Sequence, residues 1–178
     1  MPVNTKKLLI LSDSHGNIPV LTTVLQWAKN YEPDVAVFLG DGAGDVSKAE
    51  LAAGFSCEWH MVRGNNDWGS SLPDAAVFAC GGHRFFLSHG HRYGLHWGDL
   101  HLLITAARTN KADVALFGHT HAPFLENKNG FMLLNPGSIA RPRSHCASFA
   151  VIECSPDMPP KTCFLGIGQN RNITELRF

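Results

Sequence analysis

The sequence has no long hydrophobic run and no segment that resembles a signal peptide. The first apolar run, Leu8–Leu11, is too short to cross a bilayer, and no small-residue cleavage site follows it. No later run is long enough and apolar enough to span a membrane. We therefore expect a cytoplasmic protein without a membrane partner.

The chain also lacks an excess of charge and any pair of cysteines at a metal-binding spacing. Its 15 lysines and arginines equal its 15 aspartates and glutamates, a balance that gives no support to nucleic-acid binding. The five cysteines form no C-x-x-C pair, so we expect reduced, buried thiols and no cysteine-based zinc site. With no internal repeat or low-complexity tract, the 178 residues are expected to form one domain, residues 1–178.

The hydrophobic pattern predicts an α/β protein with two packed sheets and helices outside them. Asn17 and Pro19 mark the start of a helix, in which Leu21, Val24 and Leu25 recur at helical spacing. Two further helices are expected at Val46–Ala53 and Asp99–Arg108. The expected strands are Lys7–Leu11, Val35–Leu39, Glu58–Arg63, Ala75–Cys80, His83–Ser88, Asp113–Phe117, Pro123–Glu126, Phe131–Leu134, Ser148–Glu153, Thr162–Leu165 and Ile173–Phe178, with turns at Gly81-Gly82, Asn127–Gly130 and Ser155–Pro160.

Five of the apolar runs are followed directly by a short block of metal-binding residue types. Ligands at successive strand ends converge on one edge of a sheet, where open α/β sheets bind their ligands. Alone, each block is explained as well by a polar turn; together they predict one composite metal site. The blocks are Asp13-Ser14-His15, Gly40-Asp41, Gly64-Asn65-Asn66-Asp67, His89-Gly90-His91 and Gly118-His119-Thr120-His121.

Four histidines, two aspartates and one asparagine form a mixed nitrogen and oxygen donor set without thiolate. Such a set suits Mn²⁺, Ni²⁺, Co²⁺, Fe²⁺ or Zn²⁺ and is too rich in nitrogen for Ca²⁺ or Mg²⁺. Seven donors exceed the needs of one tetrahedral ion, whereas two ions that share a carboxylate would use all of them. The pattern therefore predicts two divalent metal ions, with Mn²⁺ the first choice.

In this order, the blocks resemble the calcineurin-like metallophosphoesterase superfamily, whose pattern runs D-x-H, G-D, G-N-H-D/E, H and G-H-x-H. The resemblance covers about Lys7 to Arg143. The short chain, His89-Gly90-His91 and Asn135-Pro136-Gly137-Ser138 are similar to the small phosphodiesterase branch of YfcE-like and Vps29-like proteins. The resemblance implies a four-layer αββα sandwich of two mixed sheets flanked by helices.

The resemblance also implies a role for each ligand. One metal would be held by Asp13, His15 and His121, and the other by Asn65, His89 and His119. Asp41 would bridge the two ions. The implied reaction is hydrolysis of a small phosphodiester by attack of a metal-bridging hydroxide.

One position departs from the family pattern. Many members have histidine after the ligand asparagine, where it is thought to assist the leaving group, but this chain has Asn66. An amide cannot donate a proton as an acid does. His91 is our candidate acid, with a structural histidine beside the site as the alternative. Asp67 is expected to orient Asn65 or a metal-bound water.

Each of the other residues near the blocks is open to two interpretations. Trp68, Tyr93 and Trp97 either line a pocket for a base or ring or pack against the protein. Arg141 and Arg143 contact substrate phosphate or are surface arginines, and His145 belongs with them.

Three functions remain in competition at this stage. The leading hypothesis is a dinuclear phosphodiesterase; the alternatives are a phosphomonoesterase of the same fold and a non-catalytic, Vps29-like protein-interaction module. The branch resemblance also makes a homo-oligomer an open expectation.

Overall fold

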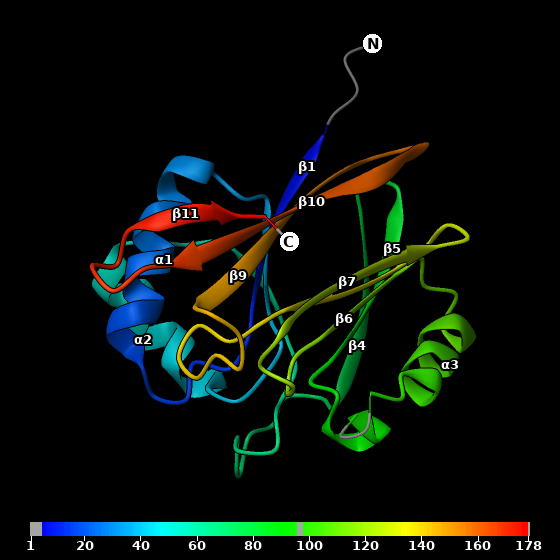
Figure 1. Cartoon of the computed structure of the whole chain (residues 1–178), viewed down its shortest axis with the longest axis horizontal. Coiled ribbons are helices and arrows are strands. Elements are labelled where there is room, and N and C mark those ends of the chain that lie inside the picture. The colour runs from blue at the N-terminus through cyan, green and yellow to red at the C-terminus, as the bar shows by residue number, and fades with distance from the viewer. Residues whose placement is uncertain (1–4, 96–97, 178) are drawn as a thin grey trace.

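Two mixed β-sheets pack face to face, and helices cover the outer face of each sheet (Figure 1). The structure is a computed structural model that describes residues 5–95 and 98–177, so Trp97 and Phe178 lie outside it. Within those residues, one sheet has six strands in the order β11 (Ile173–Leu176), β10 (Met158–Ile167), β9 (Ala147–Ser155), β1 (Lys6–Leu11), β2 (Val35–Phe38) and β3 (Glu58–Met61). The other has five, in the order β4 (Ala75–Cys80), β5 (His83–Ser88), β6 (Val114–Phe117), β8 (Phe131–Pro136) and β7 (Pro123–Lys128).

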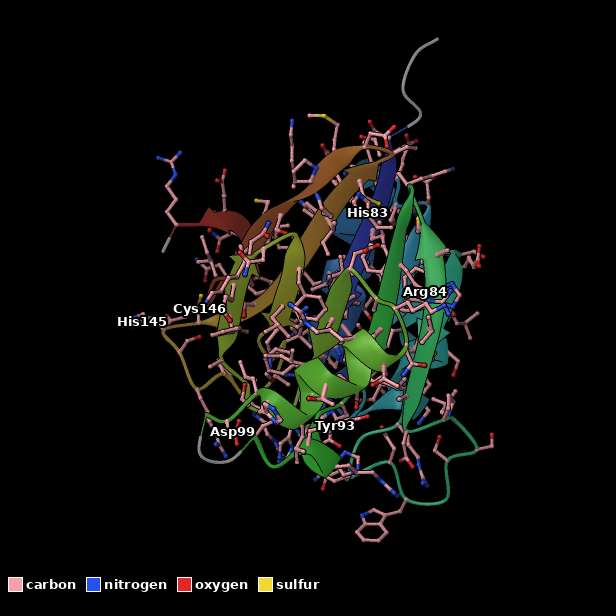
Figure 2. All side chains as sticks on the ribbon, turned by 90° about the vertical axis from the view of Figure 1, so that its right-hand side faces the viewer. His83, Arg84, Tyr93, Asp99, His145 and Cys146 are labelled. Carbon is pink, nitrogen blue, oxygen red and sulfur yellow. The ribbon has the colours of Figure 1, made fainter. Side chains whose placement is uncertain are left out.

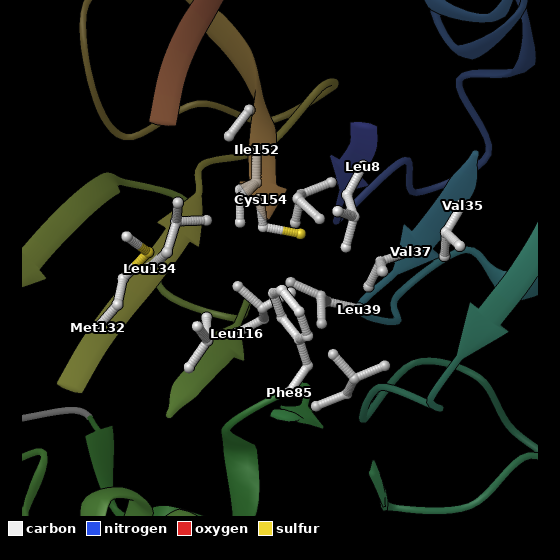
Figure 3. Packing of buried hydrophobic residues seen from close by; sticks show 14 of the residues in the cluster. Leu8, Val35, Val37, Leu39, Phe85, Leu116, Met132, Leu134, Ile152 and Cys154 are labelled. Carbon is white, nitrogen blue, oxygen red and sulfur yellow. The ribbon is translucent and has the colours of Figure 1, made fainter. Parts of the chain in front are cut away.

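Strict alternation along β1 divides the core into layers. Leu8 and Ile10 face the second sheet, where they join a cluster of side chains from both sheets (Figure 3). Leu9 and Leu11 face the opposite way, toward α1 (Ile18–Tyr31) and α2 (Val46–Ala53). All four side chains are fully buried, as expected for a strand covered on both faces.

The helix on the second sheet is α3 (His101–Thr109), which buries Leu103 and Ala107 against that sheet. The layers therefore run helix, sheet, sheet, helix, and the expected αββα sandwich is confirmed. None of the helices in the described part of the chain combines the length and the apolar character needed to cross a membrane.

Local signals placed most elements correctly. The Asn17 side chain accepts a hydrogen bond from the Val20 N–H at the start of α1, as expected of a capping residue. Gly81 and Gly82 have positive φ angles of 55° and 83° and join β4 to β5 in a tight hairpin. Two short 3₁₀ turns that the pattern did not predict, Ala43–Asp45 and His91–Tyr93, follow ligand blocks.

Several element boundaries were wrong, and three of them are informative. The third strand ends at Met61 instead of Arg63, and α3 begins at His101 instead of Asp99, with Leu100 at the N-cap position and the Asp99 carboxylate accepting the His101 N–H. The expected loop Ser155–Pro160 is mostly strand. Prolines are tolerated at 159–160 because β11 pairs only with residues 164–167, so this part of β10 is a sheet edge with a register shift.

The ligand blocks follow strands that run in the same direction. In the first sheet β1, β2 and β3 are parallel, and in the second β5 is parallel to β6. Their carboxyl ends lie at one end of the sandwich, where the β3–β4 loop extends beyond both sheets (Figure 1). His83 and Arg84 lie at the opposite end, far from Tyr93 (Figure 2).

Candidate metal centre

Side chains from all five blocks meet at the carboxyl ends of the parallel strands. Asp13 Oδ1 lies 3.1 Å from His121 Nε2 and 3.6 Å from His15 Nε2. Asp41 Oδ2 lies 3.5 Å from His89 Nε2 and 3.7 Å from His15 Nε2. These short distances between carboxylate oxygens and imidazole nitrogens outline positions at which a cation could be held.

The two remaining predicted ligands border the same space. Asn65 Oδ1 lies 3.2 Å from His89 Nε2. The His119 ring is 5.1 Å from the His89 ring between centroids, and its backbone N–H donates to Asp13 Oδ2 over 3.2 Å. The structure therefore brings together all seven predicted ligands.

Two groups of charged or imidazole donors have ligand atoms within 4.8 Å of one another: Asp13, His15 and His121, and Asp13, Asp41 and His89. The first group coincides with the set that the family pattern implies for one ion. The second contains Asp41 and His89 from the other implied set, with Asp13 at its edge, 4.0 Å from His89 Nε2.

Most of these ligands have a backbone conformation that residues other than glycine seldom adopt. Asp13, His15, Asp41, His119 and His121 all have positive φ angles, between 44° and 67°. The left-handed region is uncommon for residues other than glycine and is concentrated at functional sites. Each sharp turn after a strand end aims the next side chain at the centre.

Glycines let the ligand loops approach closely. A Cβ at Gly118 would collide with Ser12 Oγ and Asp13 Oδ2, and one at Gly64 would collide with the Asp41 carboxylate. A hydrogen at each position leaves room for the carboxylates to pack against neighbouring backbone. The glycines that precede the ligands in the blocks are therefore part of the site's geometry.

Two histidines have a fixed tautomer. His89 Nδ1 donates to the Leu39 carbonyl over 2.7 Å, and His121 Nδ1 donates to the Arg141 carbonyl over 2.7 Å. A carbonyl only accepts, so in the neutral ring Nε2 carries the free lone pair. Both Nε2 atoms point at the carboxylates, which is the orientation that metal-binding histidines are given by their backbone partners.

The carboxylates of the centre are buried and ionised. Burial by itself would raise the pKa of Asp13, but the nearby His121 and His15 outweigh it and lower that pKa to about 2. Burial likewise opposes a net lowering of the Asp41 pKa, which His89 and Asn66 produce. The centre thus concentrates negative charge in a region from which water is largely excluded, and a cation would neutralise that charge.

Asp67 anchors the loop that carries Asp41. Its carboxylate accepts the backbone N–H groups of Asp41, Gly42, Ala43 and Gly64 over 2.7–2.9 Å. The sequence predicts that Asp67 orients Asn65 or a metal-bound water, and the contacts that the structure shows for its carboxylate run to the backbone around Asp41. Asn66 also serves Asp41, to which both its backbone N–H and its side-chain amide donate.

Several residues that support the ligand loops were not predicted. Ser12 Oγ donates to Asp13, and Asp45 accepts from Ser14 Oγ and from the Gly16 N–H. Ser14 and Asp45 are 31 residues apart, and no sequence pattern joins them. In the Asn135–Ser138 motif, Asn135 Nδ2 donates to the Gly118 carbonyl and to Thr120 Oγ1, and Ser138 Oγ donates to the Asp13 carbonyl. Unlike Ser12, Ser14 and Asp45, this motif stands out in the sequence, where it is interpreted either as a tight turn or as support for the site, and these contacts are of the supporting kind.

His91 lies at the edge of the centre. Its ring centroid is 5.4 Å from that of His89 and 6.3 Å from that of His119. Its Nδ1 is buried and has no hydrogen-bond partner within the described residues. Burial, followed by the neighbouring His89 and Arg92, lowers its pKa.

An open pocket of about 760 Å³ adjoins the centre. His15, Asp41, Asn66, Trp68 and Arg141 line it. Arg143 lines a smaller pocket with His119, while His145 and Cys146 lie on a loop away from both, at the left in Figure 2. Tyr93 packs edge-on against Phe86 beneath α3, so it belongs to the core.

The residues fit a metal ion. Asp13 Oδ1 is fully buried and has no hydrogen-bond partner among the described residues, although a buried carboxylate oxygen left alone is costly. It faces two imidazole Nε2 atoms, and together they form the nitrogen and oxygen donor set that borderline divalent ions prefer. The site and the αββα layers define a metallophosphoesterase.

The comparisons with known proteins agree. The model of the calcineurin-like phosphoesterase superfamily domain matches residues 7–157, and the chain belongs to this family. It is 30% identical over 151 residues to the probable metallophosphoesterase YsnB of Bacillus subtilis, covering 84% of this chain and 85% of YsnB. It is 26% identical over 175 residues to the phosphodiesterase YfcE of Escherichia coli, covering 83% and 87%.

A solved structure confirms the fold. Vps29 from Entamoeba histolytica, crystallised in complex with zinc, superposes with a TM-score of 0.74 at 21% identity, covering 97% of this chain and 98% of Vps29. The expected likeness to the YfcE and Vps29 branch is therefore confirmed.

Proposed function

We propose that this protein is a phosphodiesterase that hydrolyses a small phosphodiester with two divalent metal ions, of which Mn²⁺ suits the donor set best. The observation that carries the proposal is the position of Asp41. Its Oδ2 faces His89 Nε2 on one side and His15 Nε2 on the other, at 3.5 and 3.7 Å. A carboxylate between two sets of donors is what a two-metal phosphoesterase requires.

The division of ligands proposed here is the one that the family resemblance implies. Asp13, His15 and His121 would hold one ion, Asn65, His89 and His119 the other, and Asp41 both. Two such cations lower the pKa of coordinated water and neutralise charge on a phosphoryl group. The protein's own part is to keep the donors fixed through the carbonyls of Leu39 and Arg141, which hold the rings of His89 and His121.

The leaving group requires a proton, and His91 is its proposed donor. Asn66 has no acidic proton, and its amide is engaged with Asp41. Because the pKa of His91 is lowered, only a small fraction of its imidazole is protonated at neutral pH, but that protonated form is a stronger acid. The Nδ1 of His91 is buried and has no hydrogen-bond partner within the described residues.

The role of His91 is tested by leaving-group dependence. His91→Ala should slow hydrolysis of an alkyl phosphodiester by about 100-fold or more, while bis-p-nitrophenyl phosphate, whose leaving group needs no proton, should lose far less. His101→Ala, at an exposed histidine on α3, is the matched control and should change neither rate. Equal losses on both substrates would exclude the acid role.

The proposed function is tested with metal-stripped protein. Mn²⁺, Ni²⁺, Co²⁺, Zn²⁺ and Mg²⁺ are returned in turn, and hydrolysis of bis-p-nitrophenyl phosphate is compared with that of p-nitrophenyl phosphate. Metal-dependent turnover of the diester that Asp41→Asn abolishes would support the phosphodiesterase. A preference for the monoester would favour the phosphomonoesterase instead.

The interaction module is the second candidate, favoured by the likeness in fold to Vps29. It predicts two bound ions, measured by equilibrium dialysis, with no turnover of either ester by any metal. Both proposed functions are compatible with the seven predicted metal ligands, so the measured rate of ester hydrolysis decides between them.

A further inference from the structure

Trp68 is exposed although it lies beside the candidate centre. Its side chain is 89% exposed. The indoles of Trp27 and Trp59 have partners: Trp27 stacks on Tyr31 at 5.4 Å, and Trp59 Nε1 donates to Glu50. Trp68 has no such partner within the described part of the chain. A single exposed apolar residue is ordinary, so its surroundings decide its meaning.

Those surroundings are the pocket of about 760 Å³ that also contains His15 and Asp41. A cavity of that size accommodates an organic ligand and not merely a phosphate ion. Much of its wall is glycine: Gly16, Gly44 and Gly69 line it, and a Cβ added at any of them would meet no atom within 4 Å. The pocket is therefore open beside the indole, with room for a flat group.

The loop that carries Trp68 is anchored through its backbone and through Asp67. Trp68 follows Asp67, which is bound to four backbone N–H groups, and the Ser70 N–H donates to the Asp67 carbonyl. The Arg63 N–H donates to the Pro73 carbonyl and closes the loop, and the Arg63 guanidinium pairs with Asp74 at 2.8 Å. An aromatic platform on an anchored loop loses little conformational entropy when a ligand binds.

Arg141 brings a positively charged residue to the same pocket as the apolar indole of Trp68. Its backbone N–H donates to Ser138 Oγ, and its carbonyl accepts from His121 Nδ1, so the Arg141 backbone is fixed beside a predicted ligand. A guanidinium suits phosphate oxygens, and an indole suits a planar ring.

We infer that Trp68 is a specificity-determining residue that stacks on a planar ring in the organic part of the substrate. The substrate class is then a phosphate ester that carries an aromatic or heteroaromatic group, such as a nucleoside. This inference rests on the proposed function for the fate of the phosphate, but ring binding at Trp68 is measured separately from catalysis.

The test compares two phosphates that differ only by a ring. Adenosine 5′-phosphate and ribose 5-phosphate are titrated into Mn²⁺-supplemented protein by calorimetry, and the probes are checked for integrity afterwards. The native chain should bind the adenosine compound more tightly. Trp68→Ala should weaken its binding by about tenfold, the worth of one aromatic stack, and leave ribose 5-phosphate unchanged.

Two variants sharpen the result. Trp68→Phe should retain most of the preference because it keeps an aromatic face. Leu51→Ala removes another apolar side chain, 87% exposed but on α2 and outside the pocket, and should change neither affinity. Wild-type affinity of Trp68→Ala for the adenosine compound, an equal loss for both probes, or a native chain without ring preference would each overturn the inference.

The chromogenic assay on the same samples separates this inference from the proposed function. Metal-dependent turnover without ring preference overturns the role of Trp68 alone. Ring-dependent binding without turnover by any metal overturns the phosphodiesterase and supports a ring-binding site.

Discussion

Removing one charge from Asp67 should loosen the metal centre without touching any predicted ligand. In Asp67→Asn an NH₂ group replaces one carboxylate oxygen. Oδ1 accepts from Gly42 and Ala43, and Oδ2 accepts from Asp41 and Gly64. Whichever oxygen is replaced, the amide donors then face two N–H groups, and two of the four hydrogen bonds are lost.

The magnitude follows from these two bonds. A hydrogen bond contributes about 0.5–1.5 kcal/mol net, and this carboxylate is only half-buried, so we expect a loss of about 1–3 kcal/mol in the free energy of unfolding. That is below the stability of a typical domain, so the variant should fold. Because the anchored loop positions Asp41, Mn²⁺ affinity should fall by about 10–100-fold, as for other residues that orient a ligand.

Two measurements check this prediction. Denaturant unfolding of the metal-free protein gives the stability, and competition with a chelating dye gives the Mn²⁺ affinity. Asp113→Asn is the control: Asp113 is exposed and accepts a single backbone N–H, from Arg84. Its loss should be under about 1 kcal/mol, with native affinity. Native Mn²⁺ affinity in Asp67→Asn would refute our view that the Asp67 contacts position Asp41.

Two further predictions concern the same centre. Gly118→Ala should destabilise the protein by about 1–3 kcal/mol and weaken Mn²⁺ binding at least tenfold, because the new methyl group collides with Ser12 and Asp13. The control is Gly44→Ala, where a Cβ meets no atom within 4 Å. In denaturant and metal titrations this control should behave as the native chain. In the metal-free protein, burial lowers the pKa of His89 but Asp41 and Asp13 outweigh it, and the neighbouring Asp13 carboxylate is the chief cause that raises the pKa of His121. Their contribution to stability is therefore complete below the unfolded value of 6.5 and lost as the pH rises through the raised folded values. Asp13, lowered from 3.8 to about 2, contributes above 3.8 and loses that contribution as the pH falls toward 2. Chemical denaturation should find these contributions greatest between those limits, whereas Mn²⁺ affinity should rise with pH as both imidazoles lose their protons; a metal-free protein that becomes more stable from pH 6 to 9 would contradict the assignment.

The sequence predicted the architecture because its signals are local. The alternation Leu8 to Leu11, the Asn17 cap and the Gly81-Gly82 hairpin each depend on neighbours within a few positions. The boundaries were wrong where tertiary contacts decide them. Prolines at 159–160 indicate a break, yet this stretch remains strand because no second strand pairs with it there.

The ligands were predictable for a related reason, and their supports were not. Strand ends of parallel strands converge by topology, so a donor after each strand implies one site. Asp67 was expected to assist Asn65 or a water, and its contacts with the backbone of Asp41–Ala43, 24 to 26 residues away, could not be read from spacing. The positive φ angles of the ligands are equally invisible in the sequence, because only a small fraction of residues other than glycine adopt that region, even among aspartates and histidines.

The positive φ angles of the ligands and the buried Asp13 oxygen both cost free energy in the folded state. Five ligands in the left-handed conformation cost about 1 kcal/mol each, and Asp13 Oδ1 adds the cost of an unpaired buried oxygen. The sum approaches the net stability of a domain, and none of it contributes to core packing. Hydrogen bonds that the Asp67 side chain accepts and the Ser138 and Asn135 side chains donate offset part of the strain. Ions that bind only the folded chain would offset the rest, since binding at 100 times the dissociation constant stabilises by about 2.7 kcal/mol. The strain is therefore best explained by a centre shaped to bind metal, and we expect the loops after β1, β2 and β6 to gain most in order when metal binds.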